Sequence, residues 1–409
     1  MRVLWNEIRK SMQMKNTYIY AAVTLAITIF FAGYCVFVSR AEDVNADGSL
    51  TIVNGSAAIP VQKNTDRSLS GQVTEEKLKN ALQTVQEHYD KTKDEFVYDK
   101  EFLNCQRLFG IMNEVNYVYP EFNEETYDSI DQMSQNMADS YYTVRAEKID
   151  KMIDAFYTSE GQKQKAKKMN EKVKVPFSYY EGYGFWNAAL EYYTILLVVI
   201  LIAAALFAAP IFAQDYHSGA DLVFRTTKYG RKTLGVCRFI VAQLYGIILF
   251  ILASLLFLGI CTFFFGSEGL QTSIQMMTIY ALADMTYGQA LGYVIVGGLI
   301  SVIGTISMIA FFSAKIKSPI VSVIISIAFI LVWKIAAMLF SSSAGSVSRL
   351  FFMTFPMSGT EMIHSLTAIS IFKLFHWYIW EPYWPILTGM FISMVFFFIT
   401  VYVYERKKY

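Results

Sequence analysis

Residues 212–238 read FAQDYHSGADLVFRTTKYGRKTLGVCR and form a short polar and basic segment between two long apolar runs. The runs cover residues 188–212 and 234–265, and each is longer than the about 20 residues that a helix needs to cross a bilayer. The segment combines an apolar cluster at Leu222, Val223 and Phe224 with a break at Tyr229-Gly230. It is too short to be a domain. We therefore predict a helix that lies across the inner mouth of a membrane bundle, where a cytosolic partner can push on it.

The composition of the whole chain is typical of a polytopic membrane protein. Its 409 residues are 54% hydrophobic and 17% charged, whereas soluble domains average about 25% charged residues. The net charge of +1 gives no field that would attract nucleic acid. Of the four cysteines, only Cys105 lies well inside the charged region, so that region has no internal disulfide framework.

Six apolar segments are each long enough to cross a bilayer. The first is longer than the core of a signal peptide, which has about 7–15 residues, so we expect an uncleaved helix there. The six segments cover residues 18–38, 188–212, 234–265, 291–312, 319–340 and 384–404. The chain should therefore divide into residues 1–39, a polar domain at 40–187 and a membrane domain at 188–409.

The polar domain is large enough to pack a core of its own. We predict that it is mostly helical, with one small β-hairpin. The hairpin should pair residues 50–53 with residues 59–62, because the Asn54-Gly55 pair favours a tight turn. A polar loop should follow at residues 64–72, and apolar periodicity predicts helices over residues 74–89, 102–112 and 124–156.

A run of lysines follows these helices, and two interpretations stay open. The run is either the solvated face of a helix or a contact with lipid head groups. It comprises Lys163, Lys165, Lys167, Lys168, Lys172 and Lys174.

Two further stretches suit a membrane interface. Residues 1–16 place Leu4, Trp5 and Ile8 on one helical face and Arg9 opposite, which indicates an interfacial helix on the inner leaflet; the alternative is a plain cytosolic helix. Residues 341–383 are half polar and too interrupted for another pair of membrane crossings, so short amphipathic or re-entrant helices are expected there.

The distribution of lysine and arginine predicts the orientation, because these residues accumulate in cytoplasmic loops. One side of the predicted bundle holds 13 of them in short segments, and the other side's short loops hold Arg349 and Lys373 only. Both termini should therefore be cytoplasmic in a cell membrane, with residues 40–187 outside the cell. The 13 are Arg2, Arg9, Lys10, Lys15, Arg225, Lys228, Arg231, Lys232, Lys315, Lys317, Arg406, Lys407 and Lys408.

The sequence carries no enzyme signature, so we expect no catalytic residue and no metal site. Gly230-Arg231-Lys232-Thr233 ends like a phosphate-binding loop, but Arg225 occupies the place of the glycine that this motif requires. Lys334 is the notable charge within a predicted span. It either snorkels to the interface or lines an outer vestibule of a pathway.

The whole arrangement resembles the type-two ATP-binding-cassette (ABC) export permeases, and in particular bacterial members with a large extracellular domain between the first two spans. The family shows an acidic residue, then a small-Gly-small turn, hydrophobic residues and a basic group before span three. Here these are Asp215, Ser218-Gly219-Ala220, Leu222-Val223-Phe224 and Arg231-Lys232. Asp215 and Ala220 stand where the family usually has Glu and Thr.

The resemblance implies a half-transporter. A second permease subunit, identical or different, would complete the pathway, and a separate ABC ATPase would bind ATP and Mg²⁺, with no cofactor in this chain. Residues 213–233 would then be the coupling segment that docks on the ATPase. The residues given this role are Asp215, Tyr216, Ser218, Gly219, Asp221, Leu222, Phe224 and Arg225, supported by Trp5 and Arg9 of the N-terminal helix.

Three functions are weighed on this basis. The first is the permease subunit of an exporter for an amphiphilic peptide, antibiotic or lipid-like compound. The second is a mechanotransmitter or sensor, in which an ATPase moves the extracellular domain without transport. The third is a receptor or scaffold that needs no ATPase.

Overall fold

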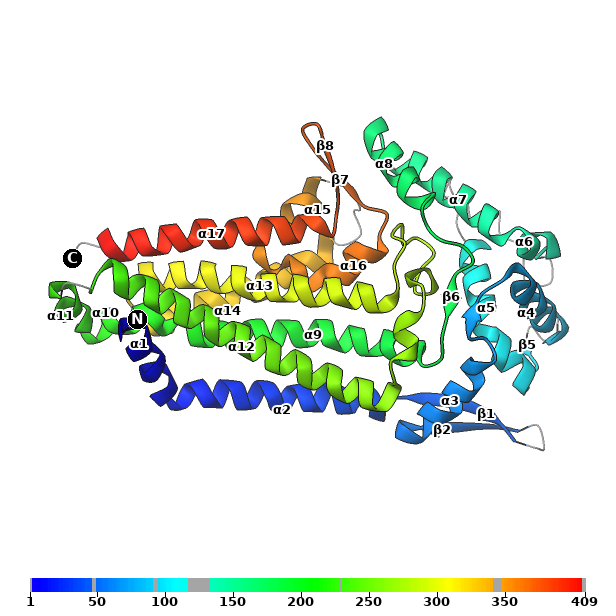
Figure 1. Ribbon diagram of the computed structural model, residues 1–409, viewed down its shortest axis with the longest axis horizontal. Coiled ribbons are helices and arrows are strands. Elements are labelled where there is room, and N and C mark those ends of the chain that lie inside the picture. Colours follow the sequence, from blue (N-terminus) through cyan, green and yellow to red (C-terminus); the bar gives the residue numbers. More distant parts are fainter. Residues whose placement is uncertain are drawn as a thin grey trace.

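The computed structural model describes residues 2–45, 49–90, 95–116, 133–227, 230–340 and 347–406. Among these residues, six helices are long and apolar enough to cross a membrane, and they lie side by side along the long axis (Figure 1). The first and last described residues lie at one end of this bundle, and the polar domain covers the other end (Figure 1). The helices are α2 (Lys15–Phe37), α9 (Tyr183–Ala208), α12 (Lys232–Phe265), α13 (Tyr287–Lys315), α14 (Pro319–Phe340) and α17 (Tyr383–Arg406). The predicted six apolar helices are thus confirmed.

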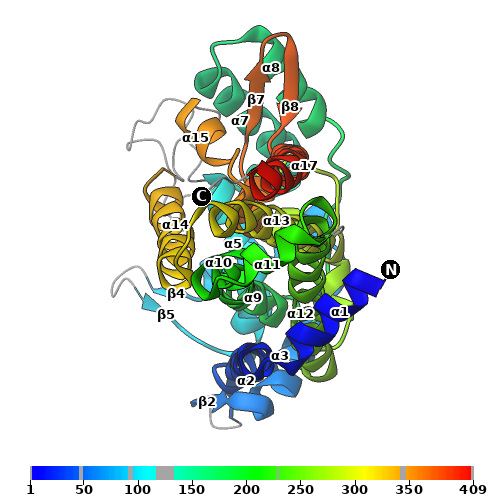
Figure 2. The same ribbon diagram turned by 90° about the vertical axis from the view of Figure 1, so that its left-hand side faces the viewer.

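Two of the six helices form the centre of the bundle. Of the most apolar stretch of α9 and of α13, 61% is buried inside the chain, against 22% to 33% for the other four helices. The end-on view shows the same arrangement, with α9 and α13 between α2, α12, α14 and α17 (Figure 2). The outer helices expose large apolar side chains, as expected of surfaces that face lipid; examples are Leu255, Ile324, Val332, Phe391 and Phe398.

Glycine permits a close backbone contact in this bundle. The turn η4 (Pro356–Glu361) lies against α13, and a Cβ atom added to Gly359 would clash with the backbone carbonyl group of Gly297. Backbone atoms cannot yield as a flexible side chain can, so any side chain at residue 359 forces α13 and η4 apart.

We expect Gly359→Ala to destabilise the chain by about 1–3 kcal/mol, the usual cost of overpacking a core. Unfolding of the purified protein in detergent measures this cost. Gly33→Ala on α2 is the matched control, because no atom lies within 4 Å of a Cβ at that residue. Equal stability of the two variants would contradict the close packing of α13 against η4.

The polar domain begins with an antiparallel hairpin of β1 (Arg40–Val44) and β2 (Leu50–Asn54). The predicted hairpin is therefore present, but its predicted second strand is wrong, because residues 59–62 belong to α3 (Ala58–Arg67). Gly55 adopts a φ of 67° and leads through η1 (Gly55–Ala57) into this helix instead of reversing the chain. Helix α3 buries Ala58 and Ile59, and it also replaces the first part of the loop expected at 64–72.

Helices make up most of the remaining polar domain. Thr74 caps α4 (Glu75–Glu87) by accepting a hydrogen bond from the Lys77 backbone N–H, as its position predicts. The long helix predicted over 124–156 lies partly outside the described residues, and its described part is two helices that meet at Ser140. The other elements are β3 (Gly71–Gln72), β4 (Tyr89–Asp90), β5 (Glu95–Phe96), α5 (Lys100–Asn116), α6 (Gln135–Asp139), α7 (Tyr141–Phe156), α8 (Glu160–Asn170) and β6 (Ser178–Tyr179).

Buried polar contacts fasten this domain to the bundle. Strand β3 pairs with β6, which comes just before α9 in the chain. Arg145 of α7 is 2% exposed and donates hydrogen bonds to the backbone oxygens of Ile279 and Ala281, in the connection between α12 and α13. Burial lowers the pKa of Arg145 to about 10, so it stays charged at neutral pH. The α12–α13 connection also contains η2 (Glu268–Gln271) and η3 (Ile274–Met276).

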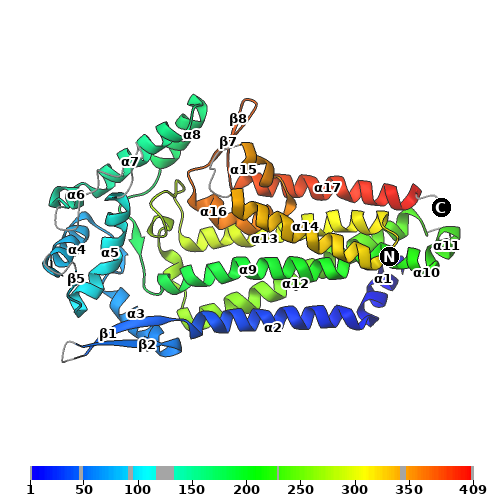
Figure 3. The ribbon, with the colours of Figure 1, turned by 180° about the vertical axis from the view of Figure 1, so that it is seen from behind.

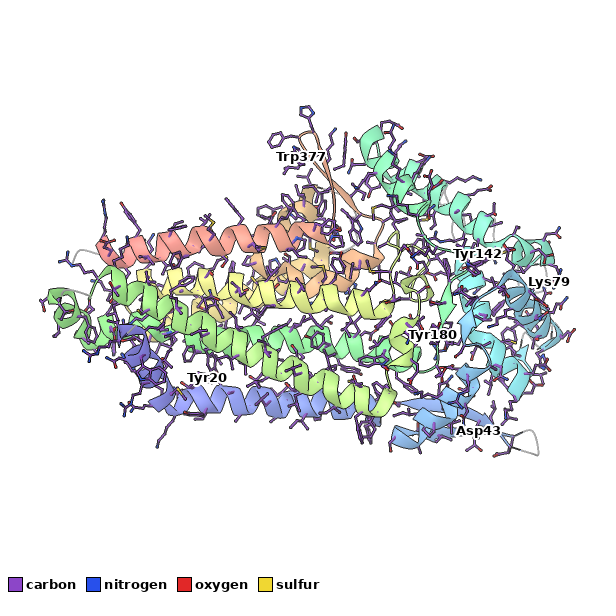
Figure 4. All side chains as sticks on the ribbon, in the orientation of Figure 1. Tyr20, Asp43, Lys79, Tyr142, Tyr180 and Trp377 are labelled. Atoms are coloured by element: carbon purple, nitrogen blue, oxygen red, sulfur yellow. The ribbon has the colours of Figure 1, made fainter. Side chains whose placement is uncertain are left out.

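The segment before α17 contains the predicted short helices and one hairpin that the sequence did not suggest. The helices are α15 (Val347–Phe352) and α16 (Met362–Thr367), with η4 between them. Strands β7 (Ile371–Leu374) and β8 (Trp377–Trp380) form the hairpin. Trp377 lies at its tip and projects from the body of the protein (Figure 4).

Candidate functional site

The segment between the second and third apolar helices folds as an elbow at the end of the bundle that carries both termini. Helix α10 (Pro210–Ser218) continues α9, Gly219 then adopts a φ of 72°, and α11 (Ala220–Thr226) leads away in a new direction. We call residues 210–226 the elbow. In the end-on view it lies over the middle of the bundle (Figure 2). The helix predicted here is therefore two helices, and its main break is at Gly219, where a left-handed backbone favours glycine.

The joint between α9 and α10 is held by two serines. Pro210 has no backbone N–H and so interrupts the helical hydrogen bonds. Ser313 Oγ of α13 accepts from the backbone N–H groups of Phe212 and Ala213, at 3.0 and 3.2 Å. Ser322 Oγ of α14 donates to the Ala209 carbonyl oxygen at 2.8 Å. Serine side chains from neighbouring helices thus replace bonds that the proline breaks, a substitution also known from the helices of membrane proteins.

The exposed tip of the elbow is apolar. Leu222 is 55% exposed and Val223 is 66% exposed, at the end of the molecule that carries many basic residues. Phe224 is half buried and turns inward. The side chain of Arg225 lies outside the described part of the chain, so its predicted role stays untested.

A buried arginine lies beneath the tip. Arg238 of α12 is 1% exposed, and its guanidinium carbon lies 5.5 Å from the centre of the Phe224 ring. Arg238 forms ion pairs with Asp215 of α10 and with Glu7 of α1 (Arg2–Gln13), the latter at 3.2 Å. We call Glu7, Asp215 and Arg238 the charge hub. It joins three helices whose residues are up to 231 positions apart in the sequence.

The predicted coupling residues divide into buried and exposed groups. Asp215 and Asp221 are 5% and 1% exposed, and Asp215 holds α10 to α12 through its ion pair with Arg238. Tyr216 is half buried, and its ring centre lies 6.3 Å from that of Tyr404 in α17. Ser218 is exposed and donates a hydrogen bond to the Asp215 carbonyl oxygen at 3.2 Å.

The N-terminal helix reaches the elbow through residues other than the predicted ones. Trp5 and Arg9 are exposed and are absent from the charge hub. Glu7 contacts Arg238, and Lys10 Nζ lies 3.6 Å from Asp215 Oδ1. Sequence reasoning missed Glu7, Lys10 and Arg238. The available signal was Arg238 itself, a charge inside an apolar run, which marks a functional candidate by default.

Lys334 lies far from this end of the bundle. It forms an ion pair with Glu361 of η4, and His364 Nε2 lies 3.7 Å from the other Glu361 oxygen. A second ion pair nearby joins Arg349 and Glu381, 2.7 Å apart and both buried. Lys334 therefore takes part in a packed polar cap, and its role in a pathway stays a prediction.

Comparisons of this chain with protein-family models, with curated proteins and with solved structures gave no match. The functional interpretation therefore depends on the geometry of the elbow and on the pattern of the sequence.

Proposed function

We propose that this chain is the membrane subunit of an ATP-driven exporter, and that a separate ATPase drives it through the elbow. The observation that carries the proposal is the pair of exposed apolar side chains, Leu222 and Val223, next in the chain to Phe224, whose ring lies against Arg238 of the buried charge hub. An exposed apolar patch with a polar rim is typical of a protein-binding surface. The family resemblance assigns that surface to the groove of an ABC ATPase.

The charge hub would let the elbow transmit motion to the helices that it joins. Ion pairs in a low-dielectric interior are stronger than pairs in water, and Arg238 links α10 to α12 and α1. A push on α11 would therefore move these helices together. Closure of the ATPase on ATP would tilt α9 and α12, so that the bundle changes between two packed states without any chemistry in this chain.

We further propose an orientation in the membrane, a second subunit and a class of cargo for this chain. The termini are cytoplasmic, the polar domain is outside the cell and a second permease subunit completes the pathway. The outward cargo is an amphiphilic compound such as a peptide, an antibiotic or a lipid-like molecule. The lysine and arginine bias and the apolar outer helices support this arrangement.

Purification of the tagged chain from its native host tests the proposal. We expect a nucleotide-binding subunit to co-purify, the complex to hydrolyse ATP, and the isolated chain to hydrolyse none. Absence of such a subunit, or ATP hydrolysis by the isolated chain, would overturn the proposal.

A mechanotransmitter is the second candidate, and one observation favours it. The contacts of Arg145 with the α12–α13 connection, and of Tyr157 with Ile369 and Ile371, would carry bundle motion into the polar domain. Inside-out vesicles that contain the complex separate the two functions. ATP-dependent uptake of an amphiphilic peptide supports export, whereas ATP hydrolysis without uptake of any tested amphiphile supports mechanotransmission.

A further inference from the structure

A cavity lies where the polar domain meets the bundle. Its volume is about 520 Å³, within the range of about 300–1,000 Å³ that is usual for small-molecule sites. Strand β1, helices α3 and α5, and the start of α9 contribute residues to its wall. Figure 3 shows these elements at the end of the bundle that the polar domain covers. Leu103, Ile111 and Met276 supply apolar walls, and Arg107, Glu114 and Tyr183 supply polar groups.

Two tyrosines in the wall of the cavity, Tyr179 and Tyr183, are 0% and 4% exposed. Their hydroxyl oxygens are fully buried and make no hydrogen bond with the described residues. A ligand in the cavity would therefore reach these hydroxyls only if the tyrosine side chains moved.

The charge arrangement favours an anion. Arg107 makes no ion pair with the described residues, and its Nη2 atom would lie 2.5 Å from a Cβ added to Gly184, in the first turn of α9. That turn contains no acidic residue, but Asp66 accepts a hydrogen bond from the Gly182 backbone N–H at 3.4 Å just before it. Arg107 is itself exposed, so its guanidinium group is open to an anion that enters the cavity.

The carboxylates in the cavity are engaged elsewhere. Glu42 forms an ion pair with Arg40 at 3.4 Å. Glu114 accepts hydrogen bonds from the Thr278 hydroxyl at 3.1 Å and the Ile279 backbone N–H at 3.4 Å. Burial also raises the pKa of Glu114, which makes its charged form less favourable. Neither carboxylate is therefore dedicated to Arg107.

We propose that this cavity binds a small amphiphilic anion, with its carboxylate or phosphate group on Arg107 and its apolar part against Leu103, Ile111 and Met276. A planar guanidinium suits either group, because it donates two parallel hydrogen bonds to two oxygens. The site is independent of the proposed export function, since binding requires only this chain.

Gly110 provides a specific way to fill the cavity. It lines the cavity from α5, and nothing lies within 4 Å of a Cβ added there. Gly110→Leu should therefore place a side chain in the cavity without a clash, and leucine is also the better helix former. Gly33→Leu, at an equally open residue of α2, is the matched control.

The test measures binding to the purified full chain in detergent by isothermal titration. The probes are N-acetyl-Phe-Leu, its C-terminal amide and benzyl phosphate. We expect N-acetyl-Phe-Leu or benzyl phosphate to bind, the uncharged amide to bind at least about tenfold more weakly, and Gly110→Leu to abolish binding. Arg107→Gln should weaken binding about tenfold or more, as expected for a lost hydrogen bond to a charged group. Arg67 is an exposed arginine outside the cavity, and the control variant Arg67→Gln should bind the same probes as tightly as the wild type.

The outcomes separate clearly. Binding of the peptide acid alone identifies a carboxylate site, and binding of benzyl phosphate alone identifies a phosphate site. The proposal fails if neither anion binds, if the amide binds as well as the acid, or if Gly110→Leu binds as the Gly33→Leu control does.

Discussion

Replacing Arg238 with methionine is expected to destabilise the folded chain by about 3–5 kcal/mol, the usual cost of breaking a buried ion pair by removing one partner. Asp215 and Glu7 would both lose their ion pairs with Arg238. The remaining cation, Lys10, is 53% exposed and lies 3.6 Å from Asp215, so it compensates little. Unfolding in detergent by denaturant measures the loss. Lys232→Met, at an exposed lysine of the same helix, should change stability little.

A triple variant of the charge hub distinguishes the effect of unpaired buried charges from the effect of altered packing. Replacing all three members, as Glu7→Leu/Asp215→Leu/Arg238→Met, removes the buried charges together, and such replacement is often neutral or stabilising. We expect the triple variant to regain most of the stability that Arg238→Met loses, but to lose the coupling of α10 to α12. If Arg238→Met unfolds with the same free energy as the wild type, the ion pairs of the charge hub contribute nothing to the stability of the fold.

The second large effect is expected at the tip of the elbow. The double variant Leu222→Asp/Val223→Asp should weaken binding of the ATPase at least about 100-fold, because each apolar side chain contributes about 1.5–3 kcal/mol when fully buried. Both side chains are exposed in this chain alone, so its own stability should change little. Titration of the purified ATPase onto the chain in lipid nanodiscs measures the affinity.

The matched control for the tip lies at the other end of the molecule. Leu50 and Ile52 of β2 are also exposed, at 42% and 49%, and Leu50→Asp/Ile52→Asp introduces the same charges. We expect this variant to bind the ATPase as the wild type does. If both double variants lose the same affinity for the ATPase, the loss is caused by the added charge or by poor expression and not by the elbow.

The sequence was most informative where local composition determines structure. The six apolar helices follow from the length of each apolar run, and the helix after Thr74 follows from its capping position. The location of the elbow also follows, because a polar segment between two spans must leave the bundle. Gly219 was visible in the sequence, but whether the chain turns at Gly219 or at Gly230 depends on the packing of α10 against α13 and α14.

Long-range pairing accounts for most of what the sequence could not predict. Glu7, Asp215 and Arg238 are distant in the chain, and no local pattern brings them together. The partner of β2 lies upstream at residues 40–44, although Asn54-Gly55 suggested a downstream partner. The cavity beside Arg107 and Tyr183 likewise draws its walls from five separate segments.

The measurement that tests the central claim most directly is photo-crosslinking from residue 223 in living cells of the native host. A photoreactive amino acid replaces Val223, and the same amino acid at Phe398, an exposed residue of α17, serves as the control. The elbow mechanism predicts that residue 223 crosslinks to an ABC ATPase, identified by mass spectrometry, and that residue 398 does not. Crosslinks from residue 223 to extracellular proteins or only to lipid would contradict it.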